Sequence, residues 1–386
     1  MPSVTLPTAS GGTETYTPSG RAAPPPARTT FPRVAYAAAH VVADPRATRD
    51  PWLAPRVDWD ATLAFRRYLW SLGFKVAEAM DTSQRGMGLD WPAAAELIRR
   101  SLAEARTIPG ADLACGVGTD QLAPAPDITL DQVRAAYEGQ LGTVEAAGGR
   151  AILMASRALV RAAKGPDDYL RLYGGLIRQA RDKVVLHWLG PMFDPALEGY
   201  WGSADLGAAA ETVLALIREH SAKVEGVKIS LLDAGREVAL RRRLPEGVLM
   251  FTGDDFNYPD LIEGDALGVS HALLGIFDAI APVAAAALSA LGRDDRAGYR
   301  ELLAPTVPLS RTIFEAPTRY YKAGVVLLAW LNGHQDHFVM VGGLQSARSA
   351  AHYAQVFRLA DTAGLLRDPD LACARMRALM ATHGVG

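Results

Sequence analysis

The sequence has few cysteines, almost no net charge and no long apolar run, and each shortage excludes a class of protein. Cys115 and Cys373 are the only cysteines among 386 residues, and they do not form a CxxC pair. This excludes a disulfide-rich scaffold and a cysteine-rich zinc site. The formal charge of −2 is too small to favour a nucleic-acid partner or an anionic membrane surface.

The sequence also lacks membrane spans and export signals. No apolar stretch reaches the roughly 18 residues of a spanning helix, and the most apolar run, near residues 280–291, contains Pro282. The first residues show no basic segment followed by an apolar core, so no secretory signal is expected. We therefore expect a cytoplasmic protein with no membrane partner.

Residues 1–30 are poor in large apolar side chains. They are rich in Ser, Thr, Pro, Gly and Ala, and three consecutive prolines stand at 24–26. Such a segment buries too little apolar surface to offset its ordering entropy, which predicts a mobile or disordered tail. The alternative is an extended arm that packs on a neighbouring subunit.

From residue 31 onward, short apolar runs alternate with longer amphipathic ones. The pattern predicts eight strands, at 34–39, 74–80, 111–117, 151–155, 183–188, 226–230, 248–252 and 266–270. Between and after them it predicts helices, at 58–72, 91–105, 130–147, 166–180, 208–221, 236–243, 258–263 and from about 280 to 291. Alternation of this kind is typical of parallel strands covered by helices.

Eight such units in about 260 residues favour a closed (β/α)8 barrel, the TIM-barrel fold, over an open sheet. We assign the barrel to residues 31–292. Residues 293–386 show only helical patterns, clearest at 311–331, 347–363 and 368–381. They are expected to form a C-terminal helical extension beside the barrel.

In this fold, chemistry is carried by residues at the carboxyl ends of the strands and in the loops that follow them. This rule selects candidate residues from the strand pattern: His40, Thr82, Ser83, Arg157, His187, Lys228 and Asp254.

Lys228 is the most informative candidate. The two-residue period of a strand puts it on one face with Gly226 and Ser230, directed into the barrel, and puts Val227 and Ile229 on the other face. A lysine inside a barrel loses much of its hydration, which lowers its pKa and exposes a nucleophilic neutral amine. The alternative from spacing alone is a structural lysine that forms an ion pair across the barrel, for instance with Asp254.

Several motifs resemble the dihydrodipicolinate synthase and N-acetylneuraminate lyase family. Residues 225–230 (EGVKIS) are similar to the strand that bears that family's Schiff-base lysine, and 250–255 (MFTGDD) are similar to its "SGDD" element. Residues 116–119 read GVGT as in the family, and 81–83 (DTS) stand in place of its "GTT" loop. Residues 317–323 (PTRYYKA) resemble the start of its last helical region. The matches keep their order over nearly the whole folded chain.

The sequence departs from the family at two strand ends. Residues 154–157 (MASR) replace the segment that carries the family's proton-relay tyrosine, and 187–190 (HWLG) replace its "YNVP" element. The resemblance therefore implies carbinolamine chemistry in a divergent branch of the family, and it does not imply dihydrodipicolinate synthase itself.

By this resemblance, Lys228 forms an iminium with a 2-oxo acid such as pyruvate, and Thr82 and Ser83 hold the substrate carboxylate. Arg157 replaces the tyrosine's electrostatic role or binds a second acidic group. His187 or His40 moves protons. Each residue also has a purely structural alternative: histidines in hydrogen bonds, Thr82 and Ser83 as caps, Arg157 in an ion pair, and Asp254 as a loop cap or a support for Lys228.

The leading hypothesis is a class I lyase or aldolase that acts on a 2-oxo acid, such as a sugar-acid derivative, without a cofactor and as a homo-oligomer, a dimer or tetramer. One alternative is a ligand-binding or regulatory barrel that has lost catalysis. Another is a metal-dependent aldolase that uses the two aspartates at 254–255 and His187. No cluster of two histidines and a carboxylate is apparent at consecutive strand ends, so no metal site is expected.

Overall fold

A computed structural model describes residues 2–8, 10–27, 29–123 and 125–385. Eight parallel strands close into a barrel in the order β10-β3-β4-β5-β6-β7-β8-β9. The strands are β3 (Ala35–Ala38), β4 (Lys75–Glu78), β5 (Leu113–Val117), β6 (Arg150–Leu153), β7 (Val184–Leu189), β8 (Val224–Ser230), β9 (Leu249–Thr252) and β10 (His271–Leu274). The predicted (β/α)8 barrel is confirmed.

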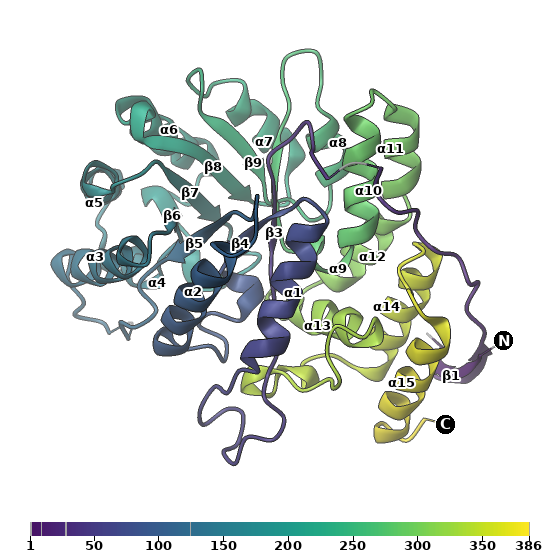
Figure 1. Ribbon diagram of the computed structural model, residues 1–386. Helices are drawn as coiled ribbons and strands as arrows, with labels where there is room; N and C mark the ends of the chain where they lie inside the picture. Colours follow the sequence, from purple (N-terminus) through teal and green to yellow (C-terminus); the bar gives the residue numbers. More distant parts are fainter. Residues whose placement is uncertain (1, 9, 28, 124, 386) are drawn as a thin grey trace.

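Helices surround the strands, as Figure 1 shows. They are α1 (Trp59–Ser71), α2 (Trp91–Ala105), α3 (Leu130–Ala146), α4 (Arg157–Ala162), α5 (Pro166–Gln179), α6 (Leu206–Glu219), α7 (Ala234–Arg241), α8 (Tyr258–Glu263), α9 (Ile276–Ala279) and α10 (Ala281–Leu291). Many of these helices begin directly after a residue whose side chain accepts a hydrogen bond from a free backbone amide of the first turn. Asp58, Asp90 and Asp205, for example, each accept the amide of the residue three positions on.

The C-terminal extension is helical, as expected. It consists of α11 (Arg296–Leu303), α12 (Thr306–Ile313), α13 (Lys322–Leu331), α14 (Ala350–Thr362) and α15 (Pro369–Thr382). The single helix expected at 311–331 is instead divided between α12 and α13. The turn between them contains Pro317, which lacks the amide that a continuous helix needs. Among the described residues, no helix combines the length and apolar character needed to span a bilayer.

The eighth strand lies later than the sequence pattern predicted. We expected it at 266–270, but β10 begins at His271. The amide of Asp265 donates to the carbonyl of Gly268, which closes a tight turn, and Leu267 on this turn is 74% exposed. Ala266, Leu267 and Val269 supply strand-like composition, but the backbone bonds of the turn occupy the positions where strand pairing would begin.

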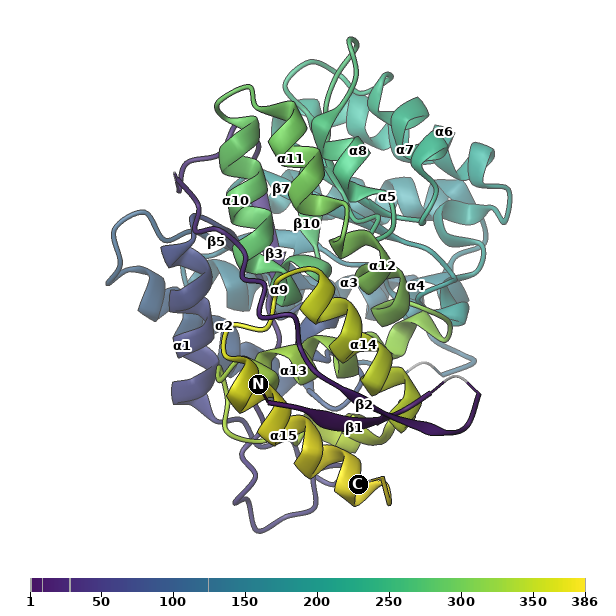
Figure 2. The same cartoon turned by 90° about the vertical axis from the view of Figure 1, so that its right-hand side faces the viewer.

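The N-terminal segment forms a folded arm on its own chain, where we expected a mobile tail or an arm on a neighbouring subunit. Strands β1 (Val4–Pro7) and β2 (Thr13–Tyr16) form an antiparallel hairpin that contacts α14 and α15. Figure 2 shows this purple segment crossing from α14 and α15 toward α10 and α1. The buried Asp361 accepts hydrogen bonds from the Tyr16 hydroxyl and from the amide and hydroxyl of Ser19. These bonds, together with the burial of Val4 and Leu6, supply the free energy that the composition of residues 1–30 did not reveal.

A polar network closes the amino-terminal end of the barrel. Arg150 at the start of β6 forms ion pairs with Asp112 at 2.9 Å and Glu225 at 3.0 Å, and it donates to the Tyr36 hydroxyl inside the barrel. Because this end is filled, a ligand reaches the interior from the carboxyl ends of the strands.

Candidate active site

Lys228 lies in β8 with its side chain inside the barrel. Its neighbours Val227 and Ile229 belong to the core between strands and helices, which is the alternation predicted for this strand. Lys228 pairs in register with His187 of β7 and Phe251 of β9. Lys228 therefore lies on the central one of three paired strands, and the hydrogen bonds to both neighbouring strands hold its backbone in place.

The amine of Lys228 is buried without a direct partner. The residue is 7% exposed, and among the described residues its side chain forms no hydrogen bond or ion pair. Burial lowers the pKa of the Lys228 ammonium from its ordinary value, and the charges of Asp81 and Asp255 offset part of that effect. Desolvation thus increases the fraction of neutral, nucleophilic amine at a given pH.

His187 is one of the two residues that pair in register with Lys228. Its Nε2 lies 3.3 Å from the Ser230 hydroxyl, and its Nδ1 has no hydrogen-bond partner among the described residues. Burial, with a smaller contribution from the Lys228 charge, lowers the pKa of His187 well below its ordinary value. The imidazole is therefore neutral at physiological pH and can accept a proton.

Of the two aspartates after β9, Asp255 acts on Lys228, and the candidate chosen from sequence, Asp254, does not. Asp254 accepts the amides of Phe256 and Asn257 and the side-chain amide of Asn257, so it caps the loop. Asp255 is buried, accepts the amide of Ile276 at 2.9 Å and is coupled electrostatically to Lys228. Burial raises the pKa of Asp255 to about 7.

The loop after β4 is a short 3-10 turn, η1 (Asp81–Ser83), and its two hydroxyls are used differently from the expectation. The Thr82 hydroxyl lies 2.8 Å from the Tyr321 hydroxyl, on the turn before α13. The Ser83 hydroxyl donates to the Ala39 carbonyl at 2.7 Å, and the Ser83 amide donates to Met80. Ser83 thus fixes the loop and has no amide or hydroxyl proton left for a ligand, whereas Thr82 faces the C-terminal helices.

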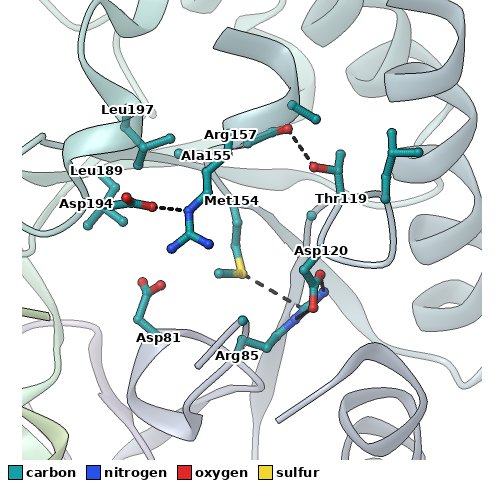
Figure 3. A pocket seen from close by; sticks show the side chains of 15 residues that line it. Asp81, Arg85, Thr119, Asp120, Met154, Ala155, Arg157, Leu189, Asp194 and Leu197 are labelled. Atoms are coloured by element: carbon teal, nitrogen blue, oxygen red, sulfur yellow. Dashed lines mark hydrogen bonds and ion pairs between the residues drawn. The ribbon is translucent and has the colours of Figure 1, made fainter. Parts of the chain in front are cut away.

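A cavity of about 230 Å³ opens at the carboxyl ends of β4 to β7. Figure 3 shows its side chains, with Asp81 and Arg157 directed into it from opposite sides. Arg157 is half-exposed and its Nε donates to Asp194 at 2.5 Å. Leu189 lines the cavity and pairs with Ser230, so Lys228 lies one layer of inward-facing residues deeper in the barrel.

Arg85, which the sequence motifs did not single out, forms part of the cavity wall. It is buried, donates to the carbonyls of Ala79 and Gly116, and forms an ion pair with Asp120. These groups and the Gln140 side chain hold its guanidinium at once, so it is a rigid positive charge at the cavity edge.

Lys322 is a second buried lysine near the mouth. Its amine donates to the Arg319 carbonyl at 3.0 Å and lies 4.6 Å from the centre of the Tyr321 ring. Burial lowers the pKa of Lys322 to about 8, and Asp81 and Arg157 act on it in opposite directions. The motif at 317–323 had indicated this segment, but the sequence did not single out Lys322 as a candidate site residue.

Three tyrosines lie behind the strand end that lacks the expected relay tyrosine. The Tyr137 hydroxyl donates to the Met154 carbonyl, and the hydroxyls of Tyr173 and Tyr200 lie 2.7 Å apart. The Tyr200 hydroxyl also accepts the amide of Ser156. They fix the backbone from which Arg157 projects. They come from distant parts of the chain, so no local pattern could have indicated them.

His40 lies apart from this group. Its ring packs on Phe65 of α1, outside the barrel, and its Nδ1 lies 2.7 Å from Asp278 of α9. Its amide also donates to Asp278 at 2.7 Å. The substrate-binding role expected for His40 therefore has no support in its position. The structure brings His187 and Lys228 together and places Arg157 at the mouth, whereas the Thr82 hydroxyl bonds to Tyr321. Ser83, His40 and Asp254 are engaged elsewhere.

Among the described residues, no group of three His, Cys, Asp or Glu side chains is arranged to hold a metal ion. His187 and the aspartates at 254–255 thus do not form the cluster that the metal-dependent alternative would need.

The fold is shared with solved dihydrodipicolinate synthases. That from Aquifex aeolicus has a TM-score of 0.61 at 11% identity, over 92% of this chain and 98% of that one. The enzyme from Bacillus clausii has a TM-score of 0.62 at 14% identity, over 84% of this chain and 96% of that one. That from Acinetobacter baumannii, solved with pyruvate, has 0.61 at 13%, over 87% and 100%. At these identities the likeness establishes the fold only, and it confirms the resemblance predicted from the motifs at that level.

No curated protein is detectably similar to the chain. Residues 4–385, from the N-terminal hairpin to the end of the helical extension, match one family along their whole length. The chain thus belongs to the family described as "Protein of unknown function (DUF993)".

Proposed function

We propose that the protein is a class I lyase or aldolase that forms a Schiff base between Lys228 and a 2-oxo acid. The observation that carries the proposal is the Lys228 amine itself, buried inside a closed barrel without a hydrogen bond or ion pair among the described residues. A buried ammonium without a partner costs several kcal/mol, so its retention inside the barrel indicates a use for the neutral amine.

The reaction begins with attack of the neutral amine on the ketone carbon of the substrate. The nitrogen loses a proton and the former ketone oxygen gains one, which gives a carbinolamine. Loss of that hydroxyl as water leaves an iminium, which withdraws electrons from the adjacent carbon and permits bond cleavage or formation there. His187, which pairs in register with Lys228, would accept the proton from nitrogen through its neutral imidazole.

Asp255 supplies the acid that the missing tyrosine would otherwise supply. Its pKa of about 7 leaves the carboxyl partly protonated at neutral pH, which suits proton donation to a departing hydroxyl. Lys228 lies in β8 and Asp255 follows the adjacent strand β9, and the charges of the two side chains act on each other, so we assign both to the same substrate.

The cavity favours a substrate with more than one acidic or hydroxyl group. Arg157 presents a guanidinium opposite Asp81, and a guanidinium can bind a carboxylate through two parallel hydrogen bonds. A sugar-acid derivative carries both kinds of group.

The test is reductive trapping. The full-length protein is incubated with pyruvate and sodium borohydride, and the modified peptide is identified by mass spectrometry. We expect one reduced adduct on Lys228, its loss in Lys228→Arg, and its retention in Lys322→Arg, the matched control at the other buried lysine. An adduct on Lys322, or none with a panel of 2-oxo acids, would overturn the proposal.

The same experiment separates the alternatives. A barrel that binds a ligand without catalysis would show saturable 2-oxo acid binding and no turnover. A metal-dependent aldolase would lose activity with a chelator and would form no borohydride adduct.

A further inference from the structure

A second cavity, of about 320 Å³, lies outside the barrel. Its walls come from α1, α9, the start of α10, α13 and the turn between α14 and α15, and residues 22–26 of the N-terminal arm cover one side. It shares no lining residue with the cavity at the barrel mouth. Figure 2 shows the arm passing between α10, α1 and α14. The two cavities are therefore separate sites.

The buried carboxylate of Asp278 lines this side cavity. Its side chain is 1% exposed, and Oδ2 is occupied by the amide and Nδ1 of His40. Oδ1 has no hydrogen-bond partner among the described residues, and no lysine or arginine forms an ion pair with Asp278 there. An unsatisfied buried carboxylate oxygen is costly, so the site lacks a hydrogen-bond donor that a ligand can supply.

Aromatic rings stand beside that carboxylate. Phe65 and Tyr68 of α1 line the cavity, and the ring of His334 packs on both, with ring centres 5.1 and 4.4 Å apart. Burial lowers the pKa of His334 to about 4, so the ring carries no charge at neutral pH. Aromatic faces attract an organic cation, and the effect is largest where water is excluded.

One cationic residue, Arg367, lines the same cavity, and its side chain is exposed to solvent. The negative charge of Asp278 raises the pKa of the Tyr68 hydroxyl, and the positive charge of Arg367 lowers it. The arrangement therefore places a negative group in the buried part and a positive group at the rim, so a carboxylate on the ligand would be tolerated near the rim.

We propose that the side cavity binds a small organic ammonium compound, with its ammonium group on Asp278 and an apolar or aromatic body against Phe65 and Tyr68. The carboxylate of Asp278, the missing donor to its Oδ1 and the aromatic rings all favour an organic ammonium group. A free amine and an amino acid both carry such a group, and only the amino acid has a carboxylate that could face Arg367. The proposal is independent of the chemistry at Lys228.

The test is calorimetric titration of the full-length protein with phenethylamine, phenylalanine and the neutral analogue 2-phenylethanol. We expect saturable binding of phenethylamine at one site per chain, and affinity for 2-phenylethanol lower by about tenfold or more. Phenylalanine that binds more tightly than phenethylamine identifies an amino acid as the natural type of ligand; weaker binding identifies a free amine.

Variants locate the site. Asp278→Asn is expected to weaken phenethylamine binding by about tenfold or more, whereas Asp60→Asn, an exposed change at the start of the same α1, should leave it unchanged. Tyr68→Leu, at a half-buried position, provides a second variant if Asp278→Asn does not fold, and it should weaken binding several-fold. Absence of saturable phenethylamine binding, or equal affinity in the folded variants and the wild type, would overturn the proposal.

Discussion

Asp254 and Asp255 are adjacent residues of one type, and the structure gives them different tasks. Their order in the sequence could not distinguish a loop cap from a group that faces Lys228, because the strand period ends at Thr252. The direction of Lys228 could be predicted, because it lies within a strand whose alternation is regular. The direction of a side chain inside a strand was thus predictable, whereas the roles of the residues in the following loop were not.

The buried carboxyl of Asp255 predicts a pH-dependent stability. Its pKa is about 7 in the folded protein and about 3.9 in an unfolded chain. The folded state binds this proton more tightly, so the contribution to stability is full below about pH 4 and is lost as the pH rises through 7. Asp255→Asn keeps an acceptor for the Ile276 amide but cannot ionise.

Between pH 5 and pH 8 we therefore expect the Tm of the wild type to fall by roughly 3–8 °C relative to that of Asp255→Asn. Thermal unfolding followed by circular dichroism at the two pH values measures this. Asp60→Asn, an exposed change at the start of α1, is the control for the loss of one carboxylate and should show no such difference. A difference for Asp255→Asn that does not change with pH would contradict the account of this carboxyl.

At the scale of elements, seven of the barrel strands follow the sequence pattern closely, because each is a buried run with a helix on either side. The eighth was placed too early, at 266–270, because the pattern cannot distinguish a strand from an apolar turn closed by its own backbone bonds. The arm at residues 4–16 was missed for another reason. Its partner, Asp361, lies more than 300 residues away.

The strand end at Gly253 fixes the position of Lys228. A Cβ at Gly253 would lie 2.2 Å from the Ser230 hydroxyl and 2.7 Å from Lys228 Cε. Gly253→Ala should therefore displace the lysine, slow reductive trapping by about tenfold or more, and destabilise the fold by about 1–3 kcal/mol. Gly118→Ala, whose Cβ would find its nearest atom at 3.7 Å, should fold normally. Trapping by Gly253→Ala at the wild-type rate would show that this contact does not position the amine.

The N-terminal arm should depend on one carboxylate. Asp361→Ala removes the acceptor for Tyr16 and Ser19, so we expect faster proteolysis of the arm and a loss of about 1–3 kcal/mol. Glu14→Ala on the same hairpin breaks only the half-exposed pair with Arg358 and should change stability by less than about 1 kcal/mol. Limited proteolysis and denaturant unfolding of both variants measure the difference; equal effects would contradict it.

At the scale of the whole molecule, one peptide group joins the side cavity to the mouth of the barrel. The carbonyl of Ala39 accepts from the Ser83 hydroxyl, and the amide of the same peptide group, on His40, donates to Asp278. No strand or helix pattern could predict this link, since it needs three segments that meet only in the fold. The expected homo-oligomer stays a prediction.

Because of this link, Asp278→Ala should loosen the loop that carries Ser83. We expect reductive trapping at Lys228 to slow by about 3- to 10-fold, with the trapped residue unchanged. Asp60→Asn is the control for the loss of one negative charge. Stopped incubations analysed by mass spectrometry give the rates, and identical rates for the variant and the wild type would show that the peptide group does not couple the two sites.

The most direct test of the central claim is a crystal of this protein soaked with pyruvate. The account predicts electron density that runs without a break from Nζ of Lys228 into the ligand, with Asp255 and His187 beside the new bond. Pyruvate bound without a covalent link, or linked to Lys322 instead, would contradict it.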